Sequence, residues 1–246
     1  MIRHLALLLL AALPAQAQLP GVADSVARRP VTVAEAPWSS LVRVQSEAGG
    51  RCTGVLIAPD RVLTAAHCLV ARLTRRMLQP GRVHVLAGYD RGSFSAHATA
   101  VALRIGPGFR PETSGPIGAD WAVLSLATPL PGPVLPLATQ LPAAGSAAML
   151  GGWQQDRAHA LLADTACQVQ RAVRDAEGRL LLRHGCAATR GVSGGPLLVR
   201  QGEGWAVMGV AVGATSGARG GLAVAVPGLD LGLDLGPNLG PNLGTE

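Results

Sequence analysis

Short apolar runs constrain the fold of this 246-residue chain more than any other feature. From Trp38 onward, these runs are separated by Gly, Pro and Asp, and they are too short for most helices. Runs of this length bounded by turn residues are typical of β-strands, so the pattern predicts an all-β fold. Expected strands include 40–45, 54–57, 82–87, 98–104, 121–126, 147–150, 180–183, 197–200 and 205–212. Only 65–76 has a pattern that also allows a helix.

A Pro- and Ala-rich stretch, 130–145, divides the chain into two halves of comparable size and is the expected linker. We predict one domain over 37–228, made of two six-stranded antiparallel β-barrels at about 37–130 and 146–228 that meet along a cleft. Residues 229–246 repeat Leu-Asp-Leu-Gly and then Gly-Pro-Asn-Leu, which is typical of a low-complexity tail.

The N-terminus has the pattern of an export signal. A basic start is followed by an apolar run and by the small-x-small string Ala15-Gln16-Ala17, so we expect a signal peptide over 1–17. A membrane anchor is the alternative, but Pro14 interrupts the run and a span needs roughly 20 apolar residues. Residues 18–36 are then an N-terminal arm or a pro-segment. We expect a secreted or periplasmic protein that does not contact the membrane once the signal is removed.

The four cysteines, an even number behind an export signal, predict two disulfides, and the sequence allows three pairings. No Cys-x-x-Cys pair and no His-Glu-x-x-His string occurs, so we expect no metal and no cofactor. The net charge of +6 comes from scattered arginines, with few aromatic residues for base stacking. We therefore expect no nucleic-acid partner, and we expect a monomer.

His67 stands in the string Leu63-Thr64-Ala65-Ala66-His67-Cys68 at the end of an expected strand. A histidine beside a half-cystine would be held on a rigid turn, which suits a base that must keep one orientation. A structural histidine in the core is the alternative, and the specificity of the surrounding string argues against it.

Asp120 opens the apolar string Trp121-Ala122-Val123-Leu124. We expect its carboxylate to be partly buried, and a buried carboxylate needs a partner. The imidazole N–H of His67 is the natural partner, because an acid in that place fixes the tautomer and stabilises the imidazolium. An aspartate that only caps the strand is the alternative.

Ser193 lies between glycines in Gly191-Val192-Ser193-Gly194-Gly195-Pro196. Glycines let the backbone turn tightly and leave the hydroxyl exposed. They also allow the N–H groups of Gly191 and Ser193 to point at one spot and form an oxyanion hole. An ordinary Gly-Ser turn is the alternative, and it loses weight beside the other two strings.

Together and in this order, the three strings resemble the catalytic blocks of the trypsin/chymotrypsin-like serine peptidases, and the similarity runs from about Trp38 to Pro227. The spacing of Cys186 and Ser193 is similar to that of the bacterial secreted branch that includes glutamyl endopeptidase-like enzymes. The resemblance implies a chymotrypsin-like double barrel with the active site between the barrels. It also implies that Ser193 is the nucleophile, His67 the general base and acid, and Asp120 the residue that orients His67.

The same resemblance implies a disulfide between Cys52 and Cys68, which closes a loop around the histidine strand. Cys167 and Cys186 are left, and they would tie the second barrel near the loop of Ser193.

The chain departs from the digestive branch of that family beside the nucleophile. That branch has an aspartate there, which captures a new N-terminal amine on activation, whereas this chain has Val192 and lacks an Ile-Val-Gly-Gly start. We therefore expect the oxyanion loop to be held without that ion pair. Arg28-Arg29 could be a processing site, but the following Pro30 disfavours cleavage there.

The expected substrate pocket is small and uncharged. Trypsin-like pockets have an acid six residues before the nucleophile, where this chain has Ala187, and 205–213 contains no histidine of the kind that glutamate-specific relatives use. The pocket residues would be Ala187, Ala188, Ala211, Gly213 and Ala214. They predict a small or medium apolar side chain at P1, the residue on the N-terminal side of the scissile bond. An Arg219 reaching inward would instead favour an acidic side chain, but we expect it on the surface.

These features predict a serine endopeptidase that acts on a protein or peptide substrate. The alternative is a catalytically inactive binding or adhesion protein on the same fold, since a fold does not entail an activity. An esterase of the α/β-hydrolase type is disfavoured, because that fold orders its triad Ser, acid, His and this chain runs His, Asp, Ser.

Overall fold

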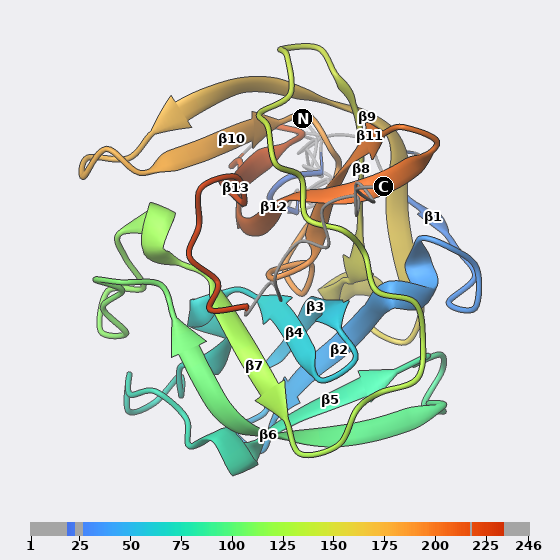
Figure 1. The fold of residues 1–246 in the computed structure, drawn as a ribbon, viewed down its shortest axis with the longest axis vertical. Coiled ribbons are helices and arrows are strands. Elements are labelled where there is room, and N and C mark those ends of the chain that lie inside the picture. The colour runs from blue at the N-terminus through green and yellow to red at the C-terminus, as the bar shows by residue number, and fades with distance from the viewer. Residues whose placement is uncertain (1–18, 23–26, 217, 234–246) are drawn as a thin grey trace, which may run out of the picture.

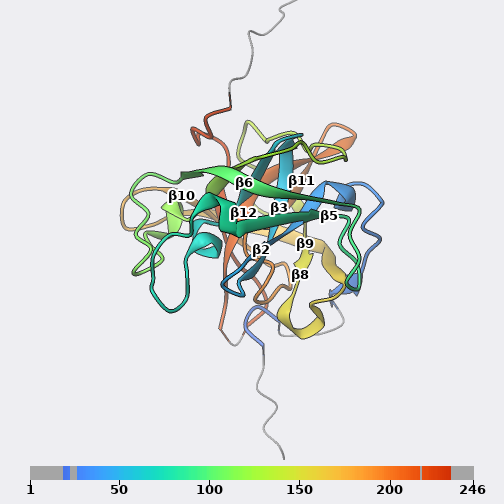
Figure 2. The ribbon, with the colours of Figure 1, turned by 90° about the horizontal axis from the view of Figure 1, so that it is seen from below.

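The computed structural model describes residues 19–22, 27–216 and 218–233. Two antiparallel β-barrels lie one above the other, the first coloured blue to green and the second yellow to red (Figure 1). Figure 2, seen from below, looks onto the first barrel. The prediction of an all-β fold with two six-stranded barrels is confirmed.

The first barrel closes in the order β2-β3-β4-β7-β6-β5, with β5 pairing back to β2. Its interior is rich in valine, which suits a pleated surface because its branched side chain packs well there. Val42, Val55 and Val85 are fully buried. The strands are β2 (Leu41–Ser46), β3 (Arg51–Ala58), β4 (Arg61–Thr64), β5 (Val83–Ala87), β6 (Ala96–Ile105) and β7 (Ala122–Leu126).

The second barrel is closed by the pairing of β8 with both β9 and β11, and a short strand of the N-terminal arm, β1 (Arg29–Pro30), pairs with β9 outside the ring. Leu150, Leu182 and Leu197 are fully buried inside it. The strands are β8 (Ala147–Trp153), β9 (Leu161–Arg174), β10 (Leu180–His184), β11 (Pro196–Gln201), β12 (Gly204–Ala214) and β13 (Gly221–Ala225).

Helical structure in the described residues is confined to single 3-10 turns. The helix allowed by the pattern of 65–76 is reduced to η3 (Ala66–Leu69), because the chain then folds back through a bridge between Val70 and Met77. The other turns are η2 (Trp38–Ser40), η4 (Pro80–Arg82), η5 (Ile117–Ala119) and η6 (Gln155–Arg157). No helix among the described residues has the length and apolar character that crossing a bilayer requires.

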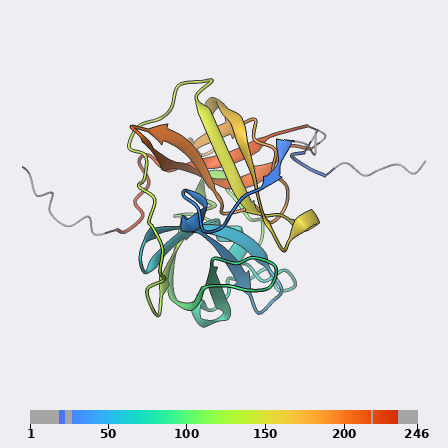
Figure 3. The ribbon, with the colours of Figure 1, turned by 90° about the vertical axis from the view of Figure 1, so that its right-hand side faces the viewer.

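Between β7 and β8 the chain runs along the outside of both barrels, as Figure 3 shows on the left. The N–H of Leu135 donates to the carbonyl of Leu56 in the first barrel, and the N–H of Ala138 donates to the carbonyl of Val207 in the second. Of the expected tail, 229–233 is described and Leu231 is buried. The expected signal peptide and residues 234–246 lie outside the described residues.

Candidate active site

Strand pairing brings His67 and Asp120 together. In the antiparallel pair of β4 and β7, Thr64 is opposite Ala122, so the residues that follow Thr64 lie beside those that precede Ala122. Nδ1 of His67 is 2.6 Å from Oδ2 of Asp120, and the backbone N–H of His67 donates to Oδ1 at 2.8 Å. The aspartate is only 4% exposed, so its carboxylate has the partner that burial demands.

This contact sets the tautomer of His67. A carboxylate facing Nδ1 favours the tautomer with a proton on that nitrogen, which leaves Nε2 free to accept a proton. The side chain of His67 is 25% exposed, so the ring remains open to a reacting group.

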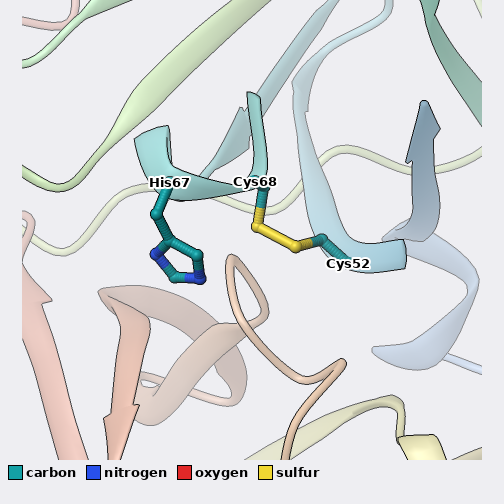
Figure 4. A group of neighbouring side chains, drawn as sticks. All are labelled: Cys52, His67 and Cys68. Atoms are coloured by element: carbon teal, nitrogen blue, oxygen red, sulfur yellow. A yellow bond between two sulfur atoms is a disulfide. The ribbon is translucent and has the colours of Figure 1, made fainter. Parts of the chain in front are cut away.

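Ser193 reaches the same place from the second barrel. Its carbonyl accepts a hydrogen bond from the N–H of Thr53 at 2.9 Å, and it lies 3.7 Å from the Sγ of Cys68. A cavity of about 250 Å³ is lined by both His67 and Ser193. Figure 4 shows His67 projecting from η3 beside the Cys52–Cys68 disulfide.

The backbone around Ser193 has the conformation that the glycines predict. Gly191 has φ +97° and Gly194 φ +81°, and a Cβ on Gly194 would lie 2.1 Å from the Oγ1 of Thr64. The N–H of Gly194 donates to the carbonyl of Ala211 at 2.7 Å. Within the described chain, the N–H groups of Gly191 and Ser193 donate to no other group, so both remain available to an oxyanion.

A buried relay from the N-terminal arm supports this loop. The guanidinium of Arg28 donates to the Oε1 of Gln154 at 2.8 Å and forms a two-bond ion pair with Asp156. The same Oε1 accepts the N–H of Thr189 at 2.9 Å, and the carbonyl of Thr189 accepts the N–H of Val192. Sequence reasoning missed this relay, because its members are far apart in the chain.

Arg28 also controls the ionisation of its partner. Burial alone would raise the pKa of Asp156, but the hydrogen bonds and the charge of Arg28 outweigh that effect and hold the pKa below its usual value. The carboxylate therefore stays ionised, and the ion pair stays intact, well into the acidic range.

A second cavity, of about 280 Å³, opens from Ser193 into the second barrel. Four of the five predicted pocket residues line it: Ala188, Ala211, Gly213 and Ala214. Ala187 lies behind the wall instead, fully buried, because its N–H donates to the buried carboxylate of Asp164 at 2.8 Å.

Sequence reasoning missed His184 in this pocket. Its Nδ1 accepts the N–H of Cys186, and its buried Nε2 has no hydrogen-bond partner among the described residues. Burial lowers the pKa of His184 to about 4, against the opposing charge of Asp164. The ring is therefore neutral near pH 7 and adds no charge to the pocket.

Arg219 does not supply a free charge to the pocket. Its Nη2 lies 2.6 Å from the Oδ2 of Asp164, which is almost completely buried. Arg190 is the one charged side chain among the described residues that line the cavity, and it is exposed to solvent.

The structure contains two disulfides, Cys52–Cys68 and Cys167–Cys186, which is the pairing that the family resemblance implies. The first holds η3, and with it His67, against the start of β3. Ligand atoms of Cys52, His67 and Cys68 lie within 4.8 Å of one another, but the two sulfurs are bonded and offer no thiolate pair to a metal.

Comparison with known proteins agrees with this geometry. A human protein, Serine protease 56, is 36% identical over 122 residues, which are 47% of this chain but only 19% of that protein. A solved structure titled as a Glu endopeptidase in complex with MPD is 20% identical, covers 82% of this chain and 91% of its own, and superposes with a TM-score of 0.66. That likeness shows a shared fold.

The family model described as Trypsin matches residues 25–229, which include both barrels and all three residues that the sequence motifs single out. Since this match extends over most of the chain, the protein belongs to the trypsin family.

Proposed function

We propose that this protein is a secreted serine endopeptidase that cleaves peptide bonds through an acyl-enzyme. The observation that carries the proposal is the hydrogen-bonded pair of His67 and Asp120, which lines one cavity together with Ser193. A hydroxyl, an imidazole and a buried carboxylate at one place are the parts that nucleophilic acyl transfer needs.

The first half of the reaction forms the acyl-enzyme. The Oγ of Ser193 attacks the scissile carbonyl carbon while Nε2 of His67 takes the hydroxyl proton, and the carbonyl electron pair moves onto oxygen. When the C–N bond breaks, the proton passes from Nε2 to the leaving amine. Asp120 keeps its own charge throughout and holds the imidazolium in place.

The second half reverses the roles with water. Nε2 of His67 takes a proton from the attacking water, the ester bond to Ser193 breaks, and the proton returns to the serine oxygen. In both halves the negative oxygen is stabilised by the N–H groups of Gly191 and Ser193, which have no other partner among the described residues.

For P1 we propose a small or medium apolar side chain. Small residues, among them Ala188, Ala211 and Gly213, line part of the pocket beside Ser193, and the neutral imidazole of His184 brings no charge into it. A basic P1 group would lose its water there without gaining an ion-pair partner, and an acidic one would find, among the described residues, only the solvent-exposed Arg190.

The pocket can be narrowed to test this preference. A Cβ on Gly213 would meet only Leu222 at 4.0 Å, so valine fits there without displacing the backbone. Gly213→Val should lower kcat/KM for a P1 leucine peptide about tenfold while sparing P1 alanine. Gly204→Val, at the far end of β12, is the matched control. An unchanged leucine-to-alanine ratio would contradict the assignment of this pocket to P1.

We also propose that the mature protein works outside the cytoplasm, in a secreted or periplasmic form. The two disulfides support this location, because such bonds persist in oxidising compartments.

The activity is tested by incubating the purified protein with a diverse peptide library and identifying the new termini by mass spectrometry. The proposal expects cleavage that is lost in Ser193→Ala. A folded wild-type protein that cleaves nothing would instead support the alternative, a catalytically inactive binding or adhesion protein on this fold.

A further inference from the structure

Arginines gather on the side of Ser193 that faces the first barrel. They line two adjoining cavities, of about 250 Å³ and 290 Å³, and no aspartate or glutamate among the described residues lines either one. We call this surface the arginine cleft. Its members come from separate segments of the chain: Arg43, Arg51, Arg72, Arg75 and Arg190.

Several arginines outside this cleft form ion pairs with carboxylates. Arg104 is paired with Asp230 and Arg179 with Glu177. In the described part of the chain, the four exposed members of the cleft form no ion pair with a carboxylate: Arg51, Arg72, Arg75 and Arg190. Their guanidinium charges are therefore not neutralised by the protein itself.

Two members have fixed positions. Arg75 donates to the carbonyl of Glu112 and to the Oγ of Ser114, which holds its guanidinium at the edge of the smaller cavity. Burial, opposed by Tyr89 and reinforced by the charge of Arg51, lowers the pKa of Arg43. The charges of Arg43 and Arg51 thus repel one another, and an added anion would relieve that repulsion.

The chemistry decides which half of a substrate lies over the arginine cleft. His67 must reach the nitrogen of the leaving amine to protonate it. His67 lines the cavity that contains arginines, whereas it does not line the alanine-rich pocket proposed for P1. The residues after the scissile bond, P1′ onward, therefore extend over the arginine cleft.

We propose that the arginine cleft selects peptide substrates with Asp or Glu among the first three residues after the scissile bond. This inference rests on the proposed endopeptidase activity. An extended peptide advances about 3.3 Å per residue, so residues P1′ to P3′ extend roughly 10 Å from the scissile bond. A guanidinium can receive a carboxylate through two parallel hydrogen bonds, which favours acidic side chains over neutral ones.

The test uses quenched fluorescent peptides that are identical from P4 to P1 and differ only at P2′ and P3′. The three versions contain Glu-Glu, Gln-Gln and Lys-Lys. The proposal expects kcat/KM to be about tenfold higher for Glu-Glu than for Gln-Gln, and lower still for Lys-Lys. This advantage should shrink severalfold between low salt and about 0.5 M NaCl, because salt screens exposed charges.

A charge reversal identifies the surface responsible. Arg72 is exposed and makes no side-chain hydrogen bond among the described residues, so Arg72→Glu should leave the fold intact while reducing or inverting the Glu-Glu to Lys-Lys ratio. Arg76→Glu is the matched control: it changes the net charge equally, in the same exposed loop, but lines neither cavity. It should keep the wild-type ratio.

A binding measurement distinguishes a wrong inference about the arginine cleft from a wrong proposal of peptidase activity. Fluorescence anisotropy with the Ser193→Ala variant measures the affinity for the same peptides without cleavage. Equal affinity and equal kcat/KM for the three peptides would overturn the inference, even if the enzyme is active. A second result would also overturn the inference: Arg72→Glu abolishes the binding of heparin or an oligonucleotide but leaves the Glu-Glu to Lys-Lys ratio of kcat/KM unchanged. The cleft would then bind another polyanion.

Discussion

His184 makes the stability of the folded protein depend on pH between about 4 and 6.5. Burial lowers its pKa from 6.5 to about 4, so the unfolded chain binds a proton more readily than the folded one at mildly acidic pH. The stability that the neutral ring provides is therefore complete above pH 6.5. It is lost as the pH falls from 6.5 towards 4, and no further loss from this group follows below that.

The size of the effect follows from the two pKa values. The full difference corresponds to about 3 kcal/mol, of which about 2 kcal/mol is already lost at pH 5. Asp156 and Asp175 have pKa values below 3.8 in the folded protein, so they contribute little between pH 8 and pH 5. The part of the change between pH 8 and pH 5 that His184→Gln removes is the contribution of this histidine.

Urea unfolding at pH 8 and pH 5 measures this loss, in the Ser193→Ala background so that self-cleavage cannot contribute. We expect the free energy of unfolding to fall by about 2 kcal/mol, and His184→Gln to remove most of that difference. His159→Gln, at an exposed histidine, is the control and should keep the wild-type dependence. Equal stability at both pH values, or the same slope in His184→Gln, would refute the reasoning.

Three further predictions concern the site and its supports. Asp120→Asn should lower kcat about 10⁴-fold with little change in KM, because His67 would lose the partner that fixes its tautomer. Steady-state kinetics measures this effect, and a loss of kcat below tenfold would contradict the role of Asp120. Replacing Cys167 and Cys186 by serine should lower the free energy of unfolding by about 3 kcal/mol, given a separation of 19 residues, and an unchanged denaturant midpoint would argue against it. Arg28→Lys should lower kcat/KM about tenfold and speed amide hydrogen exchange in 189–195, because a lysine cannot make the two-bond ion pair with Asp156 that supports this loop. Exchange rates equal to those of the wild type would contradict that role of Arg28.

The sequence predicted the parts of the fold that depend on local patterns. Strands such as β5 and β7 are mostly apolar and bounded by turn residues, so their runs are visible. The pattern missed β9 and β13. The C-terminal half of β9 is mostly exposed and carries Gln168, Gln170 and Arg171, and β13 begins at Gly221. These strands form because their neighbours in the barrel supply the pairing, which no local pattern reports.

The same distinction applies to the site. His67, Asp120 and Ser193 stand in short strings whose residue types have a chemical reason, so they could be found without coordinates. Four of the five small residues expected at the pocket line the cavity beside Ser193, whereas the N–H of Ala187 donates to the buried Asp164. His184 was missed because a single histidine at a strand end has no pattern around it.

The most direct measurement is covalent labelling with a fluorophosphonate, followed by peptide mapping to locate the modified residue. We expect stoichiometric modification of Ser193, strongly slowed in His67→Ala and absent in Ser193→Ala. Folded protein that remains unlabelled, or that is labelled at another residue, would contradict the assignment of Ser193, His67 and Asp120 as one catalytic unit.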